Sequence, residues 1–261
     1  MVGVKEMHTE KCPVVSNKEI SCGIYEIIIK CPSIADSAKP GQFLHVKAGN
    51  GMEPLLRRPI SINRIGRKNS TITLIYQVVG RGTALISRVE ADEYLDVLGP
   101  LGNPFPLRSS KKCAVVGGGI GTAPLLELAG QLQDVDAYLG FRSEPYKIEE
   151  FRKHCNEVNV ATEDGSVGYK GFVTEILARN LKNYACVYTC GPVKMMKIIK
   201  DMCKAENIEC YVSVEERMGC GVGACLVCAC KTVNEKGESH YKKACADGPV
   251  FNAEEVELDE Q

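Results

Sequence analysis

Four cysteines near the C-terminus, spaced as Cys220-x4-Cys225-x2-Cys228-x16-Cys245, constrain the fold of this chain more than any other feature of its sequence. The chain has fourteen cysteines in 261 residues, and disulfides are rare in a reducing cytosol, so metal binding is the first explanation. The C-x4-C-x2-C spacing with a distant fourth cysteine is typical of the ligands of a [2Fe–2S] cluster. Glycines between the first ligands allow a tight loop around an inorganic centre. The sequence therefore predicts a metal-holding module at the C-terminal end.

A structural zinc ion, held by four cysteines in a closed tetrahedral site, is the main alternative for this group. Zinc sites are more often built from two C-x-x-C pairs, and here only Cys225 and Cys228 form such a pair. The spacing therefore favours the iron–sulfur cluster. Cys230 is a possible replacement for Cys228, but its spacing fits less well, so we interpret it as a buried thiol.

The chain from about residue 12 to 107 has the pattern of β structure. Short β-rich runs at residues 24–29, 42–46, 60–64 and 71–79 are separated by turn signals such as Lys39-Pro40-Gly41. Short strands at such close spacing predict a small antiparallel barrel, with one short helix at residues 82–89.

From about residue 109 the pattern changes to strands that alternate with helices. Apolar strands are expected at residues 113–116, 136–141, 157–161, 185–189 and 209–214, with helices near 149–154, 172–179 and 193–206. This alternation predicts a doubly wound parallel sheet. We therefore expect an α+β multidomain chain. It has an antiparallel β-barrel in residues 1–108, a parallel α/β domain in 109–214 and a small [2Fe–2S] module in 215–261.

A glycine-rich turn, Gly117-Gly118-Gly119-Ile120-Gly121-Thr122, follows the first strand of the α/β domain. Glycines let the backbone approach a phosphate closely, and a helix N-terminus offers free N–H groups. Thr122 stands where the G-x-G-x-x-G pattern has its last glycine, and a tight turn without a ligand is the alternative.

Cys190-Gly191-Pro192 ends a later strand of the same domain. Ligands of open parallel sheets bind at the carboxyl ends of the strands, which places Cys190 where a nicotinamide could lie. A core thiol is the alternative reading.

Arginines adjoin a β-forming segment in Arg57-Arg58-Pro59-Ile60-Ser61. A guanidinium can hold a pyrophosphate through two hydrogen bonds, and Gly82-Thr83 at the start of the short helix offers further N–H groups to an anion. Solvated arginines on the edge of the barrel are the default alternative.

The overall composition excludes several classes of function. The net charge is −1, which gives no reason to expect a nucleic-acid partner or a membrane surface. No apolar run approaches the length of a membrane span and residues 1–11 lack a signal-peptide pattern, so we expect a cytoplasmic protein. We expect no catalytic acid or base, since each of the four scattered histidines should be a surface or satisfied side chain: His8, His45, His154 and His240.

Together these motifs resemble the ferredoxin–NADP reductase superfamily over nearly the whole chain, with residues 99–105 (GPLGNPF) as a further match. The cluster cysteines and the segment Asp247-Gly248-Pro249-Val250-Phe251 narrow the resemblance to electron-transfer subunits of type B dihydroorotate dehydrogenases. The resemblance implies FAD in the barrel and NAD on the α/β domain, at Gly117 to Thr122 and Cys190 to Pro192. For FAD it implies contacts from Arg58, Pro59, Ile60, Ser61, Ile75, Tyr76, Gln77, Gly82 and Thr83. Ile60 stands where many members have an aromatic residue that stacks on the flavin.

The resemblance also implies a function and a partner. An FMN-containing dihydroorotate dehydrogenase catalytic subunit would pass electrons through the [2Fe–2S] cluster and FAD to NAD+ in pyrimidine biosynthesis, in a heterotetramer with two copies of each subunit. A flavin suits the middle position, because it exchanges two electrons with nicotinamide and single electrons with a cluster. Two alternatives stay open. One is a related subunit of a sulfide dehydrogenase, hydrogenase or ferredoxin–NADP reductase complex, and the other is a non-catalytic, zinc-stabilised nucleotide-binding module.

Overall fold

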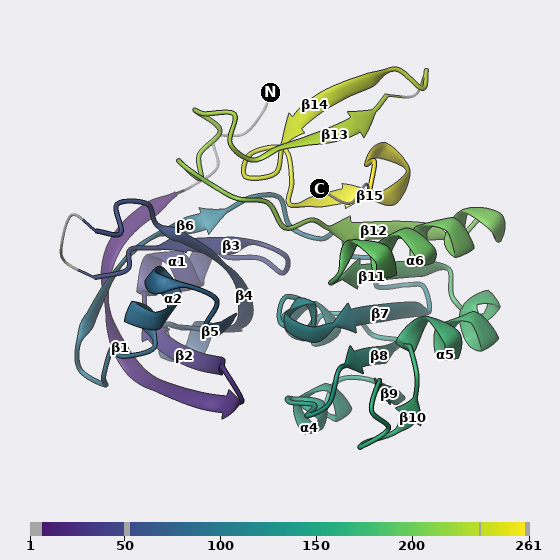
Figure 1. The fold of residues 1–261 in the computed structure, drawn as a ribbon, viewed down its shortest axis with the longest axis horizontal. Helices are drawn as coiled ribbons and strands as arrows, with labels where there is room; N and C mark the ends of the chain where they lie inside the picture. The colour runs from purple at the N-terminus through teal and green to yellow at the C-terminus, as the bar shows by residue number, and fades with distance from the viewer. Residues whose placement is uncertain (1–6, 50–52, 235, 259–261) are drawn as a thin grey trace.

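The computed structural model describes residues 7–49, 53–234 and 236–258. A β-barrel and a layered α/β domain lie side by side, and a C-terminal hairpin lies above both (Figure 1). Within the described residues, none of the helices combines the length and apolar character that crossing a membrane requires.

The barrel is closed by six antiparallel strands, as the sequence predicts. In spatial order they are β1 (His8–Ser21), β2 (Ile24–Lys30), β5 (Thr71–Gln77), β4 (Arg58–Gly66), β3 (Phe43–Val46) and β6 (Tyr94–Leu101). Two short helices accompany them, α1 (Pro32–Ser37) and α2 (Arg81–Ile86), with the 3-10 turn η1 (Arg67–Asn69) between β4 and β5.

Alternate side chains fill the barrel, because successive residues of a strand point to opposite faces. On β3, Leu44 and Val46 belong to the barrel core. Phe43 and His45, at the alternate positions, are buried as well. The outer face of β3 is therefore covered by another part of the molecule.

The second domain confirms the predicted doubly wound sheet. Its strand order is β10 (Tyr169–Lys170), β9 (Val158–Thr162), β8 (Val135–Phe141), β7 (Cys113–Gly118), β11 (Cys186–Cys190), β12 (Glu209–Ser213) and β15 (Val250–Asn252). All neighbours are parallel except β12 and β15. The chain proceeds outward from β7 in one direction and then, from β11, in the other, so the topological switch point lies between β7 and β11.

Helices cover both faces of this sheet. The core on one face contains side chains of α3 (Leu125–Ala129) and α4 (Ile148–Arg152). The core on the other face contains side chains of α5 (Val173–Asn180) and α6 (Val193–Ala205). The 3-10 turn η3 (Leu181–Asn183) follows α5.

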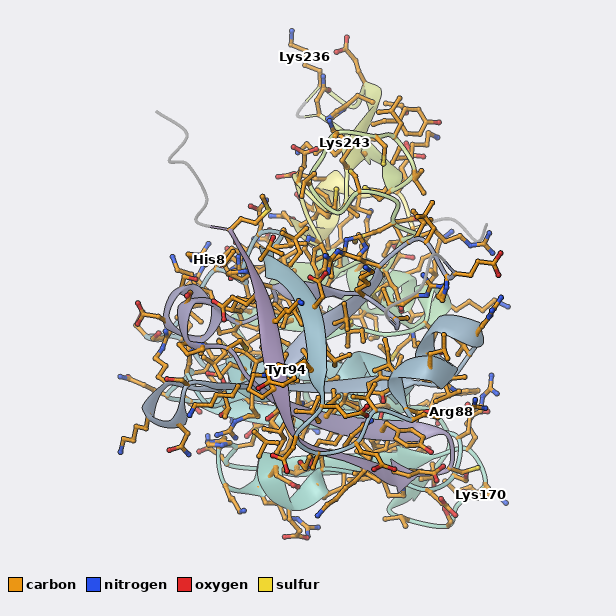
Figure 2. All side chains as sticks on the ribbon, turned by 90° about the vertical axis from the view of Figure 1, so that its left-hand side faces the viewer. His8, Arg88, Tyr94, Lys170, Lys236 and Lys243 are labelled. Carbon is orange, nitrogen blue, oxygen red and sulfur yellow. The ribbon has the colours of Figure 1, made fainter. Side chains whose placement is uncertain are left out.

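The C-terminal module is built on a hairpin of β13 (Ala229–Val233) and β14 (Ser239–Lys243). The hairpin projects beyond the barrel, with Lys236 near its tip and Lys243 closer to the body (Figure 2). Cys228 and Cys245 pack in the same buried cluster as Val212 and Val214. After the hairpin, β15 joins the large sheet antiparallel to β12, and η4 (Ala253–Glu255) follows. The module therefore shares the core of the α/β domain.

Two of the sequence motifs meet where the barrel touches this module. The amide of Asn103 donates a hydrogen bond to the carbonyl of Gly248 at 2.6 Å. A Cβ on Gly102 would lie 2.4 Å from Cδ of Pro249, so only glycine fits this contact. Residues 99–105 and 247–251 thus join the barrel to the cluster module.

Some elements differ from the predictions. The glycine-rich turn leads into a short 3-10 helix, η2 (Gly119–Thr122), and α3 has only five residues. The barrel strands β1 and β6 were not predicted. β1 is rich in polar residues, and register irregularities between Val14 and Ser16 and between Glu19 and Ser21 interrupt its alternation.

Candidate functional site

The two predicted nucleotide-binding segments meet at the switch point. Cys190, at the end of β11, pairs in register with Gly117, near the end of β7. A Cβ on Gly121 would lie 2.4 Å from the carbonyl oxygen of Cys190, and one on Gly191 would lie 2.9 Å from the amide nitrogen of Gly118. These glycines are needed because the two loops touch through their backbones.

Polar side chains fix the conformation of the glycine-rich turn. The hydroxyls of Thr122 and Tyr146 each donate to the carbonyl of Gly119 at 2.9 Å. Gly119 itself has a φ of +54°, in the left-handed region that favours glycine. Thr122 therefore has a structural reason to replace the last glycine of the pattern. The whole turn is built to hold one shape at the carboxyl edge of the sheet.

Two residues that the sequence motifs did not identify share this edge with Cys190. Ser213 pairs in register with Cys190 at the end of β12, and Glu215 follows two residues later. Burial, and then the charge of Glu215, raise the pKa of the Cys190 thiol to about 12, whereas a hydrogen bond with Ser213 lowers it. Burial also raises the pKa of Glu215. The sequence signal for Ser213 and Glu215 is the predicted parallel strand at residues 209–214, which places Ser213 at a strand end, as it places Cys190.

The flavin motif lies on β4, and its first residue reaches the short helix α2. Arg58 contacts Gly82 so closely that a Cβ there would lie 2.2 Å from Nε of the arginine. The hydroxyl of Thr83 accepts hydrogen bonds from the amides of Val79 and Gly80, at 3.0 and 3.3 Å. The structure thus brings Arg58, Gly82 and Thr83 together, with a cationic group over the first turn of α2. This cradle has the donor groups that a pyrophosphate needs.

Other residues of the predicted flavin site do not share one surface. Ile60 and Tyr76 belong to the barrel core, and the Tyr76 hydroxyl donates to Oδ1 of Asn17 at 3.1 Å. Ile75 packs instead in the core under α3, while Gln77 is exposed. Buried side chains cannot stack on a bound ring, so Ile60 and Tyr76 are able to contact a flavin only through their backbones. The remaining two predicted residues, Pro59 and Ser61, are partly exposed.

The same strand is tied to the nucleotide loop. The buried amide of Asn63 on β4 donates to the carbonyl of Ala123, directly after Thr122, at 2.8 Å. Glu127 of α3 accepts a hydrogen bond from the amide of Ile65 at 2.9 Å. These contacts fix the position of the flavin motif relative to the glycine-rich turn.

The four predicted metal ligands come together as two pairs of thiols. The Sγ atoms of Cys220 and Cys225 are 3.4 Å apart, and those of Cys228 and Cys245 are 3.2 Å apart. Among the residues that the structure describes, no three metal-ligating side chains converge on a single ion. A centre with two irons takes two thiolates at each iron, so two pairs fit a [2Fe–2S] cluster better than one zinc ion.

Backbone donors point at these sulfurs. The amides of Val222 and Cys225 lie 3.5 and 3.4 Å from Sγ of Cys220, and the amide of Gly223 lies 3.2 Å from Sγ of Cys245. Burial alone would raise the pKa of Cys220, but backbone N–H groups lower it to about 6. Burial and the neighbouring Cys228 raise the pKa of Cys245 to about 12. The loop thus favours a thiolate at its first ligand even before an iron centre adds its charge.

Cys230 is buried on β13, as the sequence interpretation expected. Its thiol donates to the carbonyl of Lys242 at 3.4 Å, and burial raises its pKa to about 11. A protonated thiol that is bonded within the hairpin is poorly suited to replace a metal ligand.

His45 corrects one expectation. It is 1% exposed, and within the described part of the chain neither ring nitrogen completes a hydrogen bond. Burial, and then the charge of Arg57, lower its pKa to about 4, although nearby backbone groups of Arg57 and Cys220 act in the opposite direction. The histidine is therefore a buried side chain rather than a surface one, and the backbone groups of Arg57 and Cys220 approach its ring without completing a hydrogen bond among the described residues.

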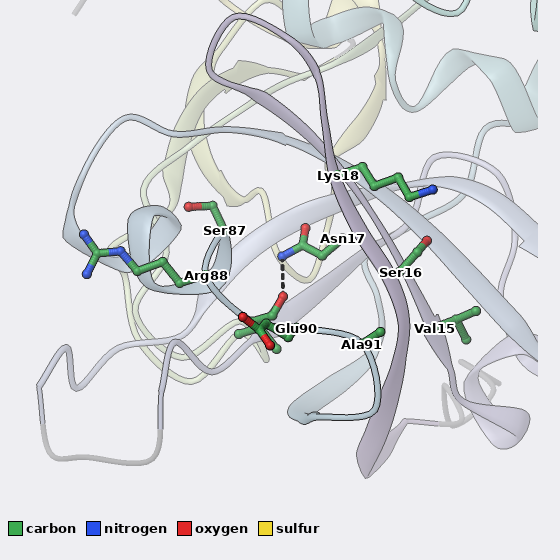
Figure 3. A pocket seen from close by; sticks show the side chains of 9 residues that line it. Val15, Ser16, Asn17, Lys18, Ser87, Arg88, Glu90 and Ala91 are labelled. Atoms are coloured by element: carbon green, nitrogen blue, oxygen red, sulfur yellow. Dashed lines mark hydrogen bonds between the residues drawn. The ribbon is translucent and has the colours of Figure 1, made fainter.

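A shallow cavity of about 590 Å³ lies elsewhere on the barrel, between β1 and the segment after α2. The side-chain amide of Asn17 donates to the carbonyls of Ile86 and Val89, each at 2.9 Å. Figure 3 draws one of these two hydrogen bonds from Asn17. None of the predicted site residues lines this cavity.

Comparisons with known proteins agree with this arrangement. A family model described as the iron–sulfur cluster binding domain of dihydroorotate dehydrogenase B matches residues 215–257. The electron transfer subunit of dihydroorotate dehydrogenase B (NAD(+)) from Geobacillus sp. (strain WCH70) is 44% identical over 97% of this chain and 100% of its own length. The corresponding subunit from Bacillus caldolyticus is 42% identical over 95% of this chain and 98% of its own length.

Solved structures give the same picture. A chain of the NADH-dependent reduced ferredoxin–NADP oxidoreductase has a TM-score of 0.84 and 29% identity, covering 99% of this chain and 92% of that one. The ferredoxin reductase of carbazole 1,9a-dioxygenase, at 18% identity and a TM-score of 0.64, covers 77% of this chain and 67% of its own and shares the fold. From its sequence identity to curated relatives along nearly its whole length, the chain belongs to the family of electron transfer subunits of dihydroorotate dehydrogenase B (NAD(+)).

Proposed function

We propose that this chain accepts electrons from an FMN-containing dihydroorotate dehydrogenase catalytic subunit and delivers them to NAD+ in pyrimidine biosynthesis. The names of its relatives support an electron transfer role beside a catalytic subunit. We propose two copies of each subunit in the complex, located in the cytoplasm, where the fourteen free cysteines remain reduced.

Three cofactors are assigned to three parts of the chain. FAD is held by residues 1–108, where Arg58, Gly82 and Thr83 would contact its pyrophosphate. NAD is held by residues 109–214 at the contact between the glycine-rich turn and Cys190. The [2Fe–2S] cluster is held by residues 215–261, and the start of the family match at residue 215 supports this boundary. When bound, the flavin supplies exchange between two-electron and one-electron chemistry.

Strand β4 carries the main argument for this assignment, because it is linked to both other sites. Toward one end, Pro59 pairs with His45, whose ring contacts Gly221 beside the first cluster ligand. Toward the other end, Asn63 donates to the carbonyl that follows the glycine-rich turn. A flavin held by this strand would therefore lie between the nucleotide and the cluster.

The cluster loop also offers a surface for the catalytic subunit. Val222, Leu226 and Val227 lie next to the cysteine ligands and are 43, 75 and 57% exposed. Exposed apolar side chains grouped on one loop favour a protein partner over solvent. A partner seated here would bring its own redox centre close to the cluster.

Copurification with the catalytic subunit from the same genome tests the proposal. We expect the complex to reduce NAD+ when dihydroorotate is supplied, and the Leu226→Asp variant to weaken assembly while leaving the bound FAD in place. A stable complex that contains both flavins but does not couple dihydroorotate oxidation to NAD+ reduction would refute the assignment.

One rival function is favoured by a specific observation. The structural match to the NADH-dependent ferredoxin–NADP oxidoreductase chain supports the same cofactors with another partner. The test is to offer reduced ferredoxin and NADP+ in place of dihydroorotate and NAD+. Our proposal expects turnover with dihydroorotate and NAD+, and none with reduced ferredoxin and NADP+.

A further inference from the structure

His45 is the one buried imidazole of the described chain that lies between the barrel and the cluster loop. It sits on β3, directly opposite Pro59 of the flavin motif. Its ring faces away from the barrel core, which takes Leu44 and Val46. A Cβ on Gly221 would lie 2.6 Å from Nδ1 of His45, so this glycine is needed for the ring to approach the loop.

The ring is enclosed at this position without completed hydrogen bonds. Both ring nitrogens are buried and complete no hydrogen bond among the described residues, although backbone groups of Arg57 and Cys220 lie close enough to raise the pKa of the ring. A neutral imidazole carries one donor and one acceptor, and leaving both unpaired in the interior is destabilising. An unpaired buried group in a native protein calls for an explanation, and a redox role or a bound group that supplies the partner is one.

The surroundings hold the ring in place. Arg57 donates to the carbonyl of His45 at 3.3 Å and forms an ion pair with Asp96 at 2.7 Å. Phe43, two residues before His45, packs in the buried cluster that contains Cys228 and Cys245. The cluster module thus packs on the outer face of β3. Of the two β3 side chains on that face, Phe43 and His45, only His45 has a hydrogen-bonding group.

The loop above His45 already gathers hydrogen-bond donors around Cys220, from the amides of Val222 and Cys225. Donors near cluster sulfurs raise the reduction potential, because they stabilise the extra negative charge of the reduced state. A ring N–H aimed at the same loop from the barrel would add to this effect.

We propose that His45 is a positioning residue for the [2Fe–2S] site, which donates a hydrogen bond to the Cys220–Gly221 loop when the cluster is bound and raises its reduction potential. This inference rests on the proposed function, since it requires the cluster. Through His45, the barrel would contribute directly to the reduction potential of the cluster on the neighbouring module.

The test compares three variants of the full chain, copurified with the catalytic subunit. His45→Leu keeps the bulk and removes the donor, whereas His45→Asn keeps an N–H near the position of Nδ1. Phe43→Leu, on the same outer face of β3, changes packing without changing hydrogen bonding. The measurements are iron and acid-labile sulfide content, the EPR spectrum of the reduced protein, and the midpoint potential of the cluster from a spectroelectrochemical titration.

We expect His45→Leu to make cluster reduction about tenfold less favourable, a shift of about 59 mV to more negative potential for a one-electron couple. His45→Asn and Phe43→Leu should stay near the potential of the unmodified protein. If His45→Leu loses the cluster, retention at normal potential in His45→Asn supports the inference equally.

An unchanged potential in His45→Leu, or an equal shift in Phe43→Leu, would overturn it. Loss of the cluster from both His45 variants would also do so, because it would assign the residue to packing. An unmodified protein that holds zinc would instead refute the proposed function, so the two failures are distinguishable.

Discussion

Replacing Gly121 by alanine should force the two nucleotide-binding loops apart. The new Cβ would lie 2.4, 2.5 and 2.6 Å from three backbone atoms of Cys190 and Gly191. Ordinary contact begins near 3.4 Å, so the loops must separate by about 1 Å. Overpacking of this kind costs about 1–3 kcal/mol, which lowers Tm by about 2–6 °C in a chain of this size.

We expect Gly121→Ala to reduce the rate of flavin reduction far more than its modest effect on Tm suggests. A misplacement of about 1 Å at a reacting centre can reduce the rate about 100-fold. We expect Gly121→Ala to slow flavin reduction by NADH by that order, measured by stopped-flow absorbance at saturating NADH. FAD content should stay unchanged, because the barrel is not altered.

Gly130→Ala is the matched control in the same domain. Its Cβ would meet its nearest neighbour at 3.5 Å, an ordinary contact, and its φ of −68° suits alanine. We expect no loss of stability or rate in this variant. If Gly121→Ala behaves like Gly130→Ala in both assays, the two loops do not form the nucleotide site as described.

Three further predictions concern the cluster, the domain contact and the acid stability. Cys228→Ser should abolish the visible absorption of the iron–sulfur cluster, whereas Cys230→Ser should retain it, and the reverse result would exchange their roles. Asn63→Ala should lower the free energy of unfolding by about 1–2 kcal/mol and slow NADH oxidation, because it removes a buried hydrogen bond between β4 and the nucleotide loop; unchanged kinetics would separate the two sites. Arg108 lowers the pKa of Glu209 to about 2, so Glu209→Gln should cost about 1–2 kcal/mol at pH 7 after allowance for solvent exposure. That difference should shrink in denaturant titrations as the pH falls below 4.5 toward 2, and a constant difference would contradict it.

The sequence was sufficient for the parts of the fold that follow from apolar periodicity. Strand β7 is buried throughout, β8 and β11 are buried at all but one position each, and all three lie within a few residues of the predicted bounds. Strand β1 was not predicted, because its polar composition and its irregular register hide the alternation that is typical of a strand. The spacing of the four cysteines also predicts the metal-holding module, because the first three ligands lie close together in the sequence and form one loop.

The parts that could not be predicted depend on how the domains pack. Nothing in the segment Phe43-Leu44-His45-Val46 says that the outer face of this strand is covered by the cluster loop. Ile60 stays a predicted flavin contact from its place in the motif, but inward alternation puts its side chain in the barrel core, which leaves only its backbone for that contact. Ser213 and Glu215 carry no motif of their own; the predicted strand at residues 209–214 places Ser213 at a strand end, but the sequence does not say that this strand pairs with the one that ends at Cys190.

Anaerobic addition of NADH to the purified complex, followed by low-temperature EPR and metal analysis, tests the central claim most directly. The account predicts bleaching of the flavin absorption, the EPR signal of a reduced [2Fe–2S] cluster, and iron and acid-labile sulfide in equal amounts. In Cys228→Ser the flavin should still be bleached while the cluster signal is absent. A protein whose four thiols hold zinc, or whose cluster stays oxidised while the flavin is fully reduced, would contradict it.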